Sequence, residues 1–199
     1  SFFEITPKMT VLDLFSGGGY YSEILSGVVG SQGTVLSHNN EAYLAFVNAE
    51  VTSRYGDDRL PNVRQLTAEA NALKLEPSSI DAVLAVLTWH DFYYVDPANN
   101  WPEIDTVKVV EALCSGVKPG GVLGIVDHVA AAGSDPWDSG QNLHRIDPDR
   151  IRADLEGSCF AFEAESNVLR NPDDDHGKSM GDPSVRGQTD RVVYRFRRN

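Results

Sequence analysis

The chain has 199 residues, of which 41% are hydrophobic and 23% charged, and its net charge is −12. A chain of this length can bury a full core, and we expect one domain over residues 1–199. Phosphate backbones repel so acidic a chain, which excludes nucleic acid as the expected partner and favours a small molecule. No apolar run approaches the roughly 18 residues of a membrane span, so we expect no membrane insertion.

Cysteine usage is sparse, because Cys114 and Cys159 are the only two cysteines. Neither belongs to a CxxC pair, which excludes a cysteine-built zinc site and a disulfide framework. We expect two buried thiols, with a single disulfide as the alternative. We see no signal-peptide pattern and expect a cytoplasmic protein, with an exported form whose leader has been removed as the alternative. Monomer and homodimer both stay open.

Along the chain, apolar runs of strand length alternate with segments of helical period, a pattern typical of an α/β fold with a mainly parallel sheet. The predicted strands cover residues 9–15, 34–37, 62–67, 80–87 and 122–129, and the helices between them cover 20–29, 41–54 and 104–117. Leu44, Val47 and Val51 are expected on one face of the second helix, and Ile104, Val107, Cys114 and Val117 are expected to point inward from the third. Pro119-Gly-Gly121 is predicted to stop that third helix.

The pattern changes after residue 129. Residues 130–146 are expected to form an irregular loop, and Asp147-Pro148 to cap and begin a helix that ends near residue 156. Two last strands at 160–169 and 191–197 are joined without a helix, which predicts an antiparallel pair. The expected fold is therefore a seven-stranded, mainly parallel sheet with a C-terminal antiparallel hairpin.

The stretch VLDLFSGGGYYSEIL, residues 11–25, places consecutive glycines between a strand and a helix. Such a turn brings bare backbone beside any ligand at the carboxyl edge of the sheet. The dinucleotide fingerprint G-x-G-x-x-G would need a third glycine at position 22, which is serine, and this disfavours a nicotinamide-dependent oxidoreductase. The pattern Asp13-x-Phe15-x-Gly17-x-Gly19 resembles the first motif of class I S-adenosylmethionine-dependent methyltransferases, D/E-x-G-x-G-x-G, with Phe15 replacing its first glycine.

This resemblance extends over nearly the whole chain and implies a Rossmann-like methyltransferase fold with S-adenosyl-L-methionine as cofactor and S-adenosyl-L-homocysteine as product. It implies that Asp13 helps to hold the cationic amino end of the cofactor and that Glu69 recognises the adenine amino group. The acid that usually binds the ribose is missing, so Asn39 is the expected replacement, with Glu41 in reserve. The cofactor-binding residues implied are Asp13, Phe15, Gly17, Gly19, Tyr20, Asn39, Glu69, Ala70 and Leu87.

More narrowly, the chain resembles a subgroup of predicted bacterial methyltransferases that share the blocks GGGYYSE, WHD or YHD, DH, LHRIDP and RGxTDR. These blocks stand here at residues 17–23, 89–91, 127–128, 143–148 and 186–191. The resemblance implies a cofactor class and leaves the methyl acceptor open.

Unusual polar residues follow the predicted strand ends, where ligands bind in open α/β sheets. Methyl transfer depends mostly on orientation, and a nucleophile that loses a proton needs a base such as histidine. We expect His90 to be this base or to orient the substrate, with Asp91 fixing it or contacting the substrate and His128 as a second candidate. For each histidine the alternative is a hydrogen-bonded structural role. The expected substrate contacts are Tyr21, Trp89, His144, Arg145 and Arg186, the arginines serving an anionic group.

The acidic run at residues 173–176, DDDH, only superficially resembles a metal cluster, because adjacent loop residues rarely converge on one ion. We expect a solvated loop there and no metal requirement. The leading hypothesis is an S-adenosylmethionine-dependent methyltransferase acting on a small molecule. The alternatives are a protein that binds the same cofactor without methylating, either a lyase-like enzyme or a sensor, and a non-catalytic interaction domain.

Overall fold

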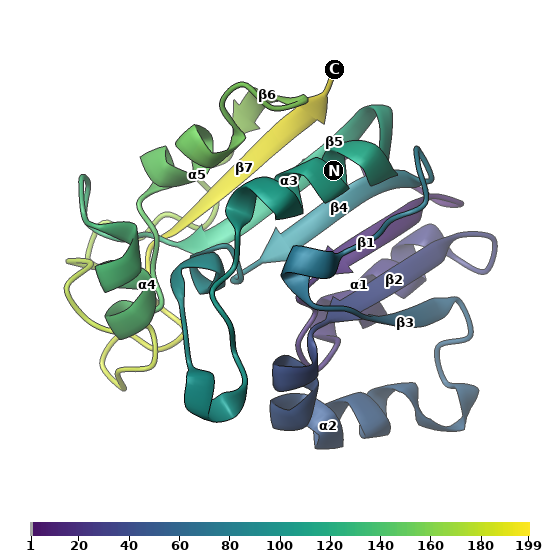
Figure 1. Ribbon diagram of the computed structural model, residues 1–199, viewed down its shortest axis with the longest axis horizontal. Coiled ribbons are helices and arrows are strands. Elements are labelled where there is room, and N and C mark those ends of the chain that lie inside the picture. Colours follow the sequence, from purple (N-terminus) through teal and green to yellow (C-terminus); the bar gives the residue numbers. More distant parts are fainter. Residues whose placement is uncertain (1) are drawn as a thin grey trace.

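The computed structural model describes residues 2–199 and is built on one seven-stranded sheet in the order β3-β2-β1-β4-β5-β7-β6 (Figure 1). The strands are β1 (Thr10–Leu14), β2 (Thr34–Asn39), β3 (Val63–Thr67), β4 (Ile80–Val86), β5 (Val117–His128), β6 (Phe160–Glu165) and β7 (Arg191–Arg198). Strands β1 to β5 pair in parallel, whereas β7 is antiparallel to both β5 and β6. The expected mainly parallel α/β sheet with an antiparallel C-terminal pair is confirmed.

The strand order reverses between β1 and β4, because β2 and β3 continue on one side of this pair and β5 on the other. Asp13 is in register with Leu84 and Leu14 with Ala85, so the two strands finish side by side. A crevice for ligands forms outside the carboxyl ends of the strands at such a reversal. The glycine turn after β1 and the segment after β4 are therefore neighbours.

Apolar clusters cover both faces of the sheet. The larger one includes Leu12 and Leu14 and packs under α3 (Thr106–Gly116) and α5 (Pro148–Leu155), in front of the sheet in Figure 1. The smaller one includes Val11 and lies under α1 (Tyr20–Val29) behind the sheet. Neighbouring residues of β1 thus serve opposite faces, as the two-residue period of a strand requires.

Helix α2 (Glu41–Tyr55) departs from this layered arrangement and is not stacked with α3 and α5 in front of the sheet (Figure 1). Of the three apolar residues predicted on one face of this helix only Val51 is buried, and Phe46 is 86% exposed. Val47 has non-helical backbone angles, which kink the helix. Leu44 and Val47 are only partly buried, because α2 lies at the carboxyl edge instead of on a face of the sheet. No helix within residues 2–199 is both long and apolar enough to cross a membrane.

The segment predicted to be an irregular loop, residues 130–146, contains helix α4 (Pro136–Leu143). Asp135 caps this helix by accepting a hydrogen bond from the backbone N of Asp138 at 3.0 Å, and Pro136 occupies its first turn. Asp and Pro in these positions are standard helix-start signals, so the sequence did carry a marker for α4.

Helix α3 also differs from its prediction. Its buried residues include Val109, Val110 and Leu113, whereas Val107 is 65% exposed. The helix begins at Thr106 because the Asp105 side chain accepts from the backbone N of Val107 at 3.1 Å. Strand β5 then starts directly at Val117, so the glycines of 119–121 bulge within the strand rather than ending the helix.

Cys114 and Cys159 form a disulfide, which corrects the expectation of two buried thiols. Cys114 belongs to α3, and Cys159 immediately precedes β6. Hydrogen bonds to both cysteine carbonyls hold the same corner, since the side-chain Nε of Arg198 donates to that of Cys114 at 2.9 Å and the backbone N of Asn199 to that of Cys159 at 2.9 Å. The bond therefore ties a helix on one face to the edge strand.

Replacing both cysteines, as C114S/C159S, is expected to lower the free energy of unfolding by about 4 kcal/mol, the loop-closure entropy of a cross-link across 45 residues. Urea unfolding of the oxidised protein measures this loss. Wild type unfolded in the presence of a thiol reductant is the control and should match the double variant. Equal stability of oxidised wild type and double variant would contradict the prediction.

Candidate functional site

The glycine turn after β1 has an unusual backbone, with φ of +52° at Phe15, +56° at Gly17 and +80° at Gly19. Residues with side chains rarely adopt this left-handed region, so Phe15 is strained where the related motif has glycine. The side chain of Asn39 braces the turn from β2. Its Nδ2 donates to the carbonyl of Gly17 at 2.9 Å, and its Oδ1 accepts from Gly17 N at 2.9 Å.

His38 supports the same turn from inside. Its Nδ1 accepts from the backbone N of Phe15 at 3.3 Å, and its Nε2 donates to the carbonyl of Ala68 at 3.0 Å. Burial lowers the pKa of His38 to about 4, so the ring is neutral and suits one donor and one acceptor role. The ends of β1, β2 and β3 are thereby tied together.

Asp13, the last polar residue of β1, is 2% exposed. Its Oδ2 accepts from Ser22 Oγ in α1 at 2.7 Å, yet burial raises the pKa of Asp13 to about 7. Ser22 is the residue that breaks the dinucleotide fingerprint, and here it serves as the partner of this carboxyl group.

Helix α2 packs directly against the outside of the glycine turn. A Cβ atom placed on Gly18 would lie 2.8 Å from Glu50 Cβ, and one on Gly17 would lie 3.1 Å from the Tyr43 ring. Arg54 Nε donates to the carbonyl of Gly18 at 2.6 Å, and its guanidinium also pairs with Glu23 of α1. Because Gly17 and Gly18 have no side chains, α2 can approach the turn closely.

Aromatic rings fill the space inside the turn. The Phe15 ring stacks on Trp101 with centroids 5.7 Å apart and meets Tyr43 edge-on at 6.2 Å. Trp101 and Tyr43 were not among the expected site residues, because an isolated tryptophan in a loop and a tyrosine in a helix carry no motif.

The segment after β4 provides the other half of the site. Leu87 has φ +59°, and the chain then enters the short helix η3 (His90–Tyr93). Asp127 of β5 is fully buried and accepts from His90 twice, from the backbone N at 2.9 Å and from Nδ1 at 2.6 Å. With Nδ1 held by Asp127, His90 Nε2 faces Asp91 Oδ1 at 3.3 Å.

The charge environment of His90 is strongly negative. Burial alone lowers its pKa, but Asp127 and Asp91 outweigh that effect and raise the pKa of His90 to about 9. Burial alone would raise the pKa of Asp127, but the paired His90 outweighs burial and brings this pKa below its ordinary value. His90 is therefore held between two carboxyl groups that favour its protonated form, and it is poorly suited to act as a base near neutral pH.

Helix α4 brings His144 to the same place. His144 has φ +51° at the C-terminal cap of α4, and its Nδ1 lies 3.7 Å from Asp91 Oδ1. The helix packs so tightly on η3 that a Cβ on Gly140 would lie 2.7 Å from the carbonyl oxygen of Tyr93 and 2.9 Å from that of His90. The positions of His144 and His90 are thus coupled through backbone contact.

A cavity of about 360 Å³ adjoins these groups, and most of its wall is aromatic. The residues that line it are Ala42, Tyr43, Phe46, Asp91, Tyr94, Asp96, Asn99, Trp101 and His144. Its dimensions and its mix of apolar walls with a few polar groups are typical of a small-molecule site. Of the aromatic run after His90, Tyr94 lines the cavity, whereas Phe92 and Tyr93 are buried in the core.

Buried polar atoms without a hydrogen-bond partner surround the start of α2. They are Glu69 Oε2, Trp101 Nε1 and Asn40 Nδ2. Glu69 Oε1 accepts from the backbone N of Glu41 at 3.3 Å, and the Trp101 ring lies 5.5 Å from that of Tyr43. Since buried polar atoms normally find partners, these mark places where a ligand could supply them.

Several expected site residues lie away from the cavity. Trp89 is fully buried and donates through Nε1 to Asp154 at 2.9 Å, and Ala70 is buried in the larger cluster. Tyr20 is 61% exposed on α1, and Tyr21, half-buried beside it, meets it edge to face. Arg186 is exposed in the loop before β7.

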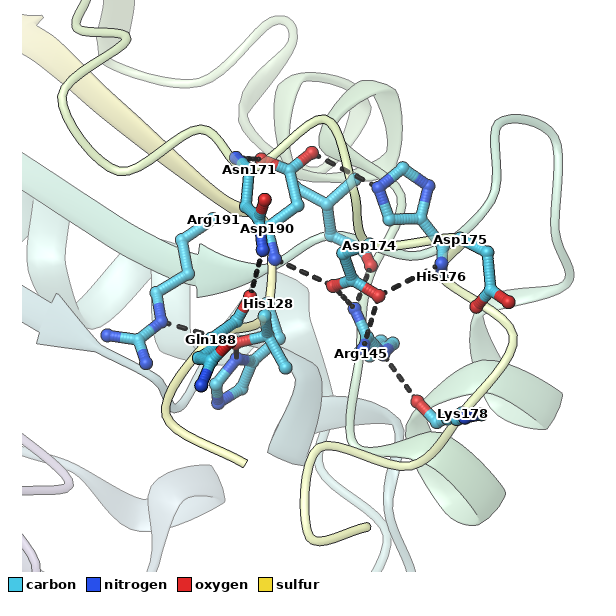
Figure 2. A network of polar contacts seen from close by, with 12 residues as sticks. His128, Arg145, Asn171, Asp174, Asp175, His176, Lys178, Gln188, Asp190 and Arg191 are labelled. Atoms are coloured by element: carbon cyan, nitrogen blue, oxygen red, sulfur yellow. Dashed lines mark hydrogen bonds and ion pairs between the residues drawn. The ribbon is translucent and has the colours of Figure 1, made fainter. Parts of the chain in front are cut away.

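Arg145 is also turned away from the cavity, and Figure 2 shows its surroundings. The guanidinium is fully buried and bidentate on Asp174, at 2.8 and 3.1 Å, and it also donates to the carbonyls of Val129 and Lys178. Asp174 further accepts from Asp190 N. The arginine thus anchors the 170–190 loop, and Asp174 is a buried partner where the sequence suggested a solvated acid.

His128 has a supporting place next to His90. Its backbone N donates to Asp127 Oδ1 at 2.7 Å, and its Nδ1 lies 2.7 Å from Thr189 Oγ1. Burial lowers the pKa of His128 to about 4. Its ring centroid is 5.8 Å from that of His90, so it packs against the site.

No protein-family model and no curated protein matches the chain. Solved structures do match it. A SAM-dependent methyltransferase from Aquifex aeolicus is 21% identical, with a TM-score of 0.67 over 98% of this chain and 85% of that one. A second, from Mesorhizobium loti, is 16% identical, with a TM-score of 0.61 over 98% and 93%. The [4+2]-cyclase SpnF is 15% identical, with a TM-score of 0.64 over 98% and 76%. The chain therefore has the Rossmann-like fold of S-adenosylmethionine-dependent methyltransferases.

Asp13 is expected to make stability depend on pH. Its pKa is about 7 when folded, against 3.8 as the ordinary value, so the folded protein binds more protons and this group costs stability as pH rises between those values. D13N removes the titration and keeps an acceptor for Ser22. Relative to wild type, D13N should gain up to about 4 kcal/mol in unfolding free energy between about pH 4 and pH 8. A difference that stays flat across this range in urea titrations would contradict it.

Proposed function

We propose that the chain is an S-adenosylmethionine-dependent methyltransferase acting on a small molecule. The observation that carries this proposal is the meeting of the glycine turn after β1 with the His90-Asp91 segment after β4, at the strand reversal beside an aromatic cavity. The shared fold supports the proposal, and so do the buried polar atoms without partners, because a bound cofactor could satisfy them.

The residues around α2 fit an adenosyl group in two respects. Glu69 Oε2, an acceptor without a partner, matches the exocyclic amino group of adenine, and Trp101 Nε1 is a free donor nearby. Asn39 uses both side-chain atoms on Gly17, so it holds the turn, and Glu41 is the carboxyl group left for ribose hydroxyls. Asp13 lies at the end of β1, and its buried carboxyl group, with a pKa of about 7, would ionise when it pairs with the cationic amino end of the cofactor. When bound, the cofactor supplies an electrophilic methyl group.

The cavity would hold the methyl acceptor. Tyr43, Tyr94 and Trp101 provide apolar walls that exclude water and orient a flat or apolar molecule. Asp91 and His144 supply polar contacts to it, and His90 positions Asp91. Holding two reactants in line can contribute several kcal/mol, on the order of 7–11 in favourable cases, which makes orientation the main task of these residues.

A second candidate is a protein that binds the cofactor without transferring its methyl group. Two observations favour it: α2 packs on the glycine turn, and the similar solved structures include a [4+2]-cyclase. Product analysis separates the two. Formation of S-adenosylhomocysteine only when an acceptor is present supports methyl transfer, whereas cleavage without an acceptor, or binding with no product, supports the second candidate.

Calorimetric titration with S-adenosylmethionine and S-adenosylhomocysteine tests the cofactor. E69Q is expected to weaken binding about tenfold or more, because it replaces an acceptor by a donor and leaves one polar group unmatched, at a cost of roughly 1–3 kcal/mol. E76Q is the matched control, since Glu76 is exposed ahead of β4 at the opposite edge of the sheet. No binding to wild type, or equal effects of the two variants, would contradict the proposal.

Helix α2 is expected to oppose cofactor binding, because its side chains occupy the outside of the glycine turn. R54A removes the hydrogen bond to Gly18 and the ion pair to Glu23, and should tighten S-adenosylmethionine binding by up to about tenfold, the equivalent of a charged hydrogen bond of roughly 1.5 kcal/mol. R64A, at an exposed arginine on β3, is the control and should bind like wild type. Weaker binding by R54A would show that the contact supports the cofactor.

A further inference from the structure

We propose that His90, Asp91 and His144 form a binding site for a divalent first-row transition-metal ion. His90 Nε2 lies 3.3 Å and His144 Nδ1 3.7 Å from Asp91 Oδ1, and one ligand atom from each of the three residues lies within 4.8 Å of the other two. The expectation of no metal requirement was argued from the acidic run at 173–176, in which Asp174 pairs with Arg145. The set proposed here unites residues from two separate segments.

The spacing is close to that required by one ion. Bonds of about 2.1 Å at a tetrahedral angle place donor atoms roughly 3.4 Å apart. The distance from His90 to Asp91 matches this value, and that from His144 to Asp91 is slightly longer, whereas the donor atoms of the two histidines, within 4.8 Å of each other, would have to approach. Small side-chain rotations would bring all three groups onto a common centre.

The outer contacts orient the donors as a metal site requires. Asp127 accepts the Nδ1 proton of His90, so Nε2 is the ligand atom, and a bound ion would take the place of the Nε2 proton that faces Asp91. A carboxylate behind a ligating histidine is the usual arrangement around protein-bound metals, because it fixes the tautomer and strengthens the donor. Asp127 is held in turn by the backbone N of His90 and of His128.

The donors are held in place before any ion arrives. Asp91 and His90 belong to η3, and His144 caps α4, the helix whose Gly140 lies against the backbone of η3. The His90 and His144 rings are nearly perpendicular, at 86°, with centroids 5.6 Å apart. An ion would therefore meet a largely formed site and would cost little reorganisation.

Donor chemistry selects the class of ion. Two imidazole nitrogens and one carboxyl oxygen suit Zn²⁺, Mn²⁺, Fe²⁺ or Co²⁺ better than Mg²⁺ or Ca²⁺, which prefer oxygen ligands. Three protein ligands leave coordination positions free, as in catalytic metal sites. Asp91 and His144 line the cavity of about 360 Å³, so those positions would be available to an oxygen or nitrogen atom of a bound molecule.

The ion-binding proposal goes beyond the proposed function and does not rest on it, since binding requires no cofactor. The experiment uses the full chain stripped with a chelator and titrated, without S-adenosylmethionine, with Zn²⁺ by calorimetry and with Co²⁺ by visible absorption. We expect one equivalent to bind, with a Co²⁺ spectrum of nitrogen and oxygen ligation and a rise in Tm.

H144G is the decisive variant, because His144 is partly exposed and glycine suits its positive φ. H144G and D91N should each weaken Zn²⁺ binding about 100-fold, and D127N about 10–100-fold through the orientation of His90. H176A is the control, at a histidine that contacts Asp190 instead. Absence of stoichiometric binding to wild type would overturn the proposal, as would unchanged affinity in H144G or a loss in H176A equal to that in H144G.

Discussion

The buried carboxyl group of Asp127 is the constraint on which the candidate site depends. It accepts from the backbone N and Nδ1 of His90 and from the backbone N of His128, so the chain after β4 must follow one path. A buried charge is costly unless it is paired and hydrogen-bonded, and here His90 is the partner. That path fixes η3, on which α4 packs, and thereby the placement of Asp91 and His144 beside the cavity.

Much of the fold could be predicted from the sequence because local patterns agree with it. Apolar runs between turn signals located all seven strands, and Ser22 together with Gly17 and Gly19 separated this turn from a dinucleotide fingerprint. The prediction failed where long-range geometry decides. Helix α2 has apolar residues at helical spacing yet lies at the sheet edge, and the cysteines meet only because β7 places β6 beyond β5.

The site was predictable in part, since strand ends pointed to His90 and Asp91. The place of His144 in the site could not be predicted from sequence spacing. His144 reaches Asp91 through the packing of α4, a segment that was expected to be a loop. Arg145 shows the opposite error. A lone arginine beside a histidine suggested substrate binding, but Asp174, in an acidic run typical of exposed loops, buries it in an ion pair (Figure 2). Buried pairs of distant charges leave no local signal.

The absence of a side chain at Gly140 has a consequence for recognising related proteins. Any Cβ at this position would press on the carbonyls of His90 and Tyr93 and push α4 away from η3. A chain that keeps histidines equivalent to 90 and 144 but carries a larger residue at 140 would therefore hold them farther apart. Glycine at position 140, which contacts no ligand itself, thus distinguishes chains able to assemble this site from chains that have its histidines in sequence but cannot bring them together.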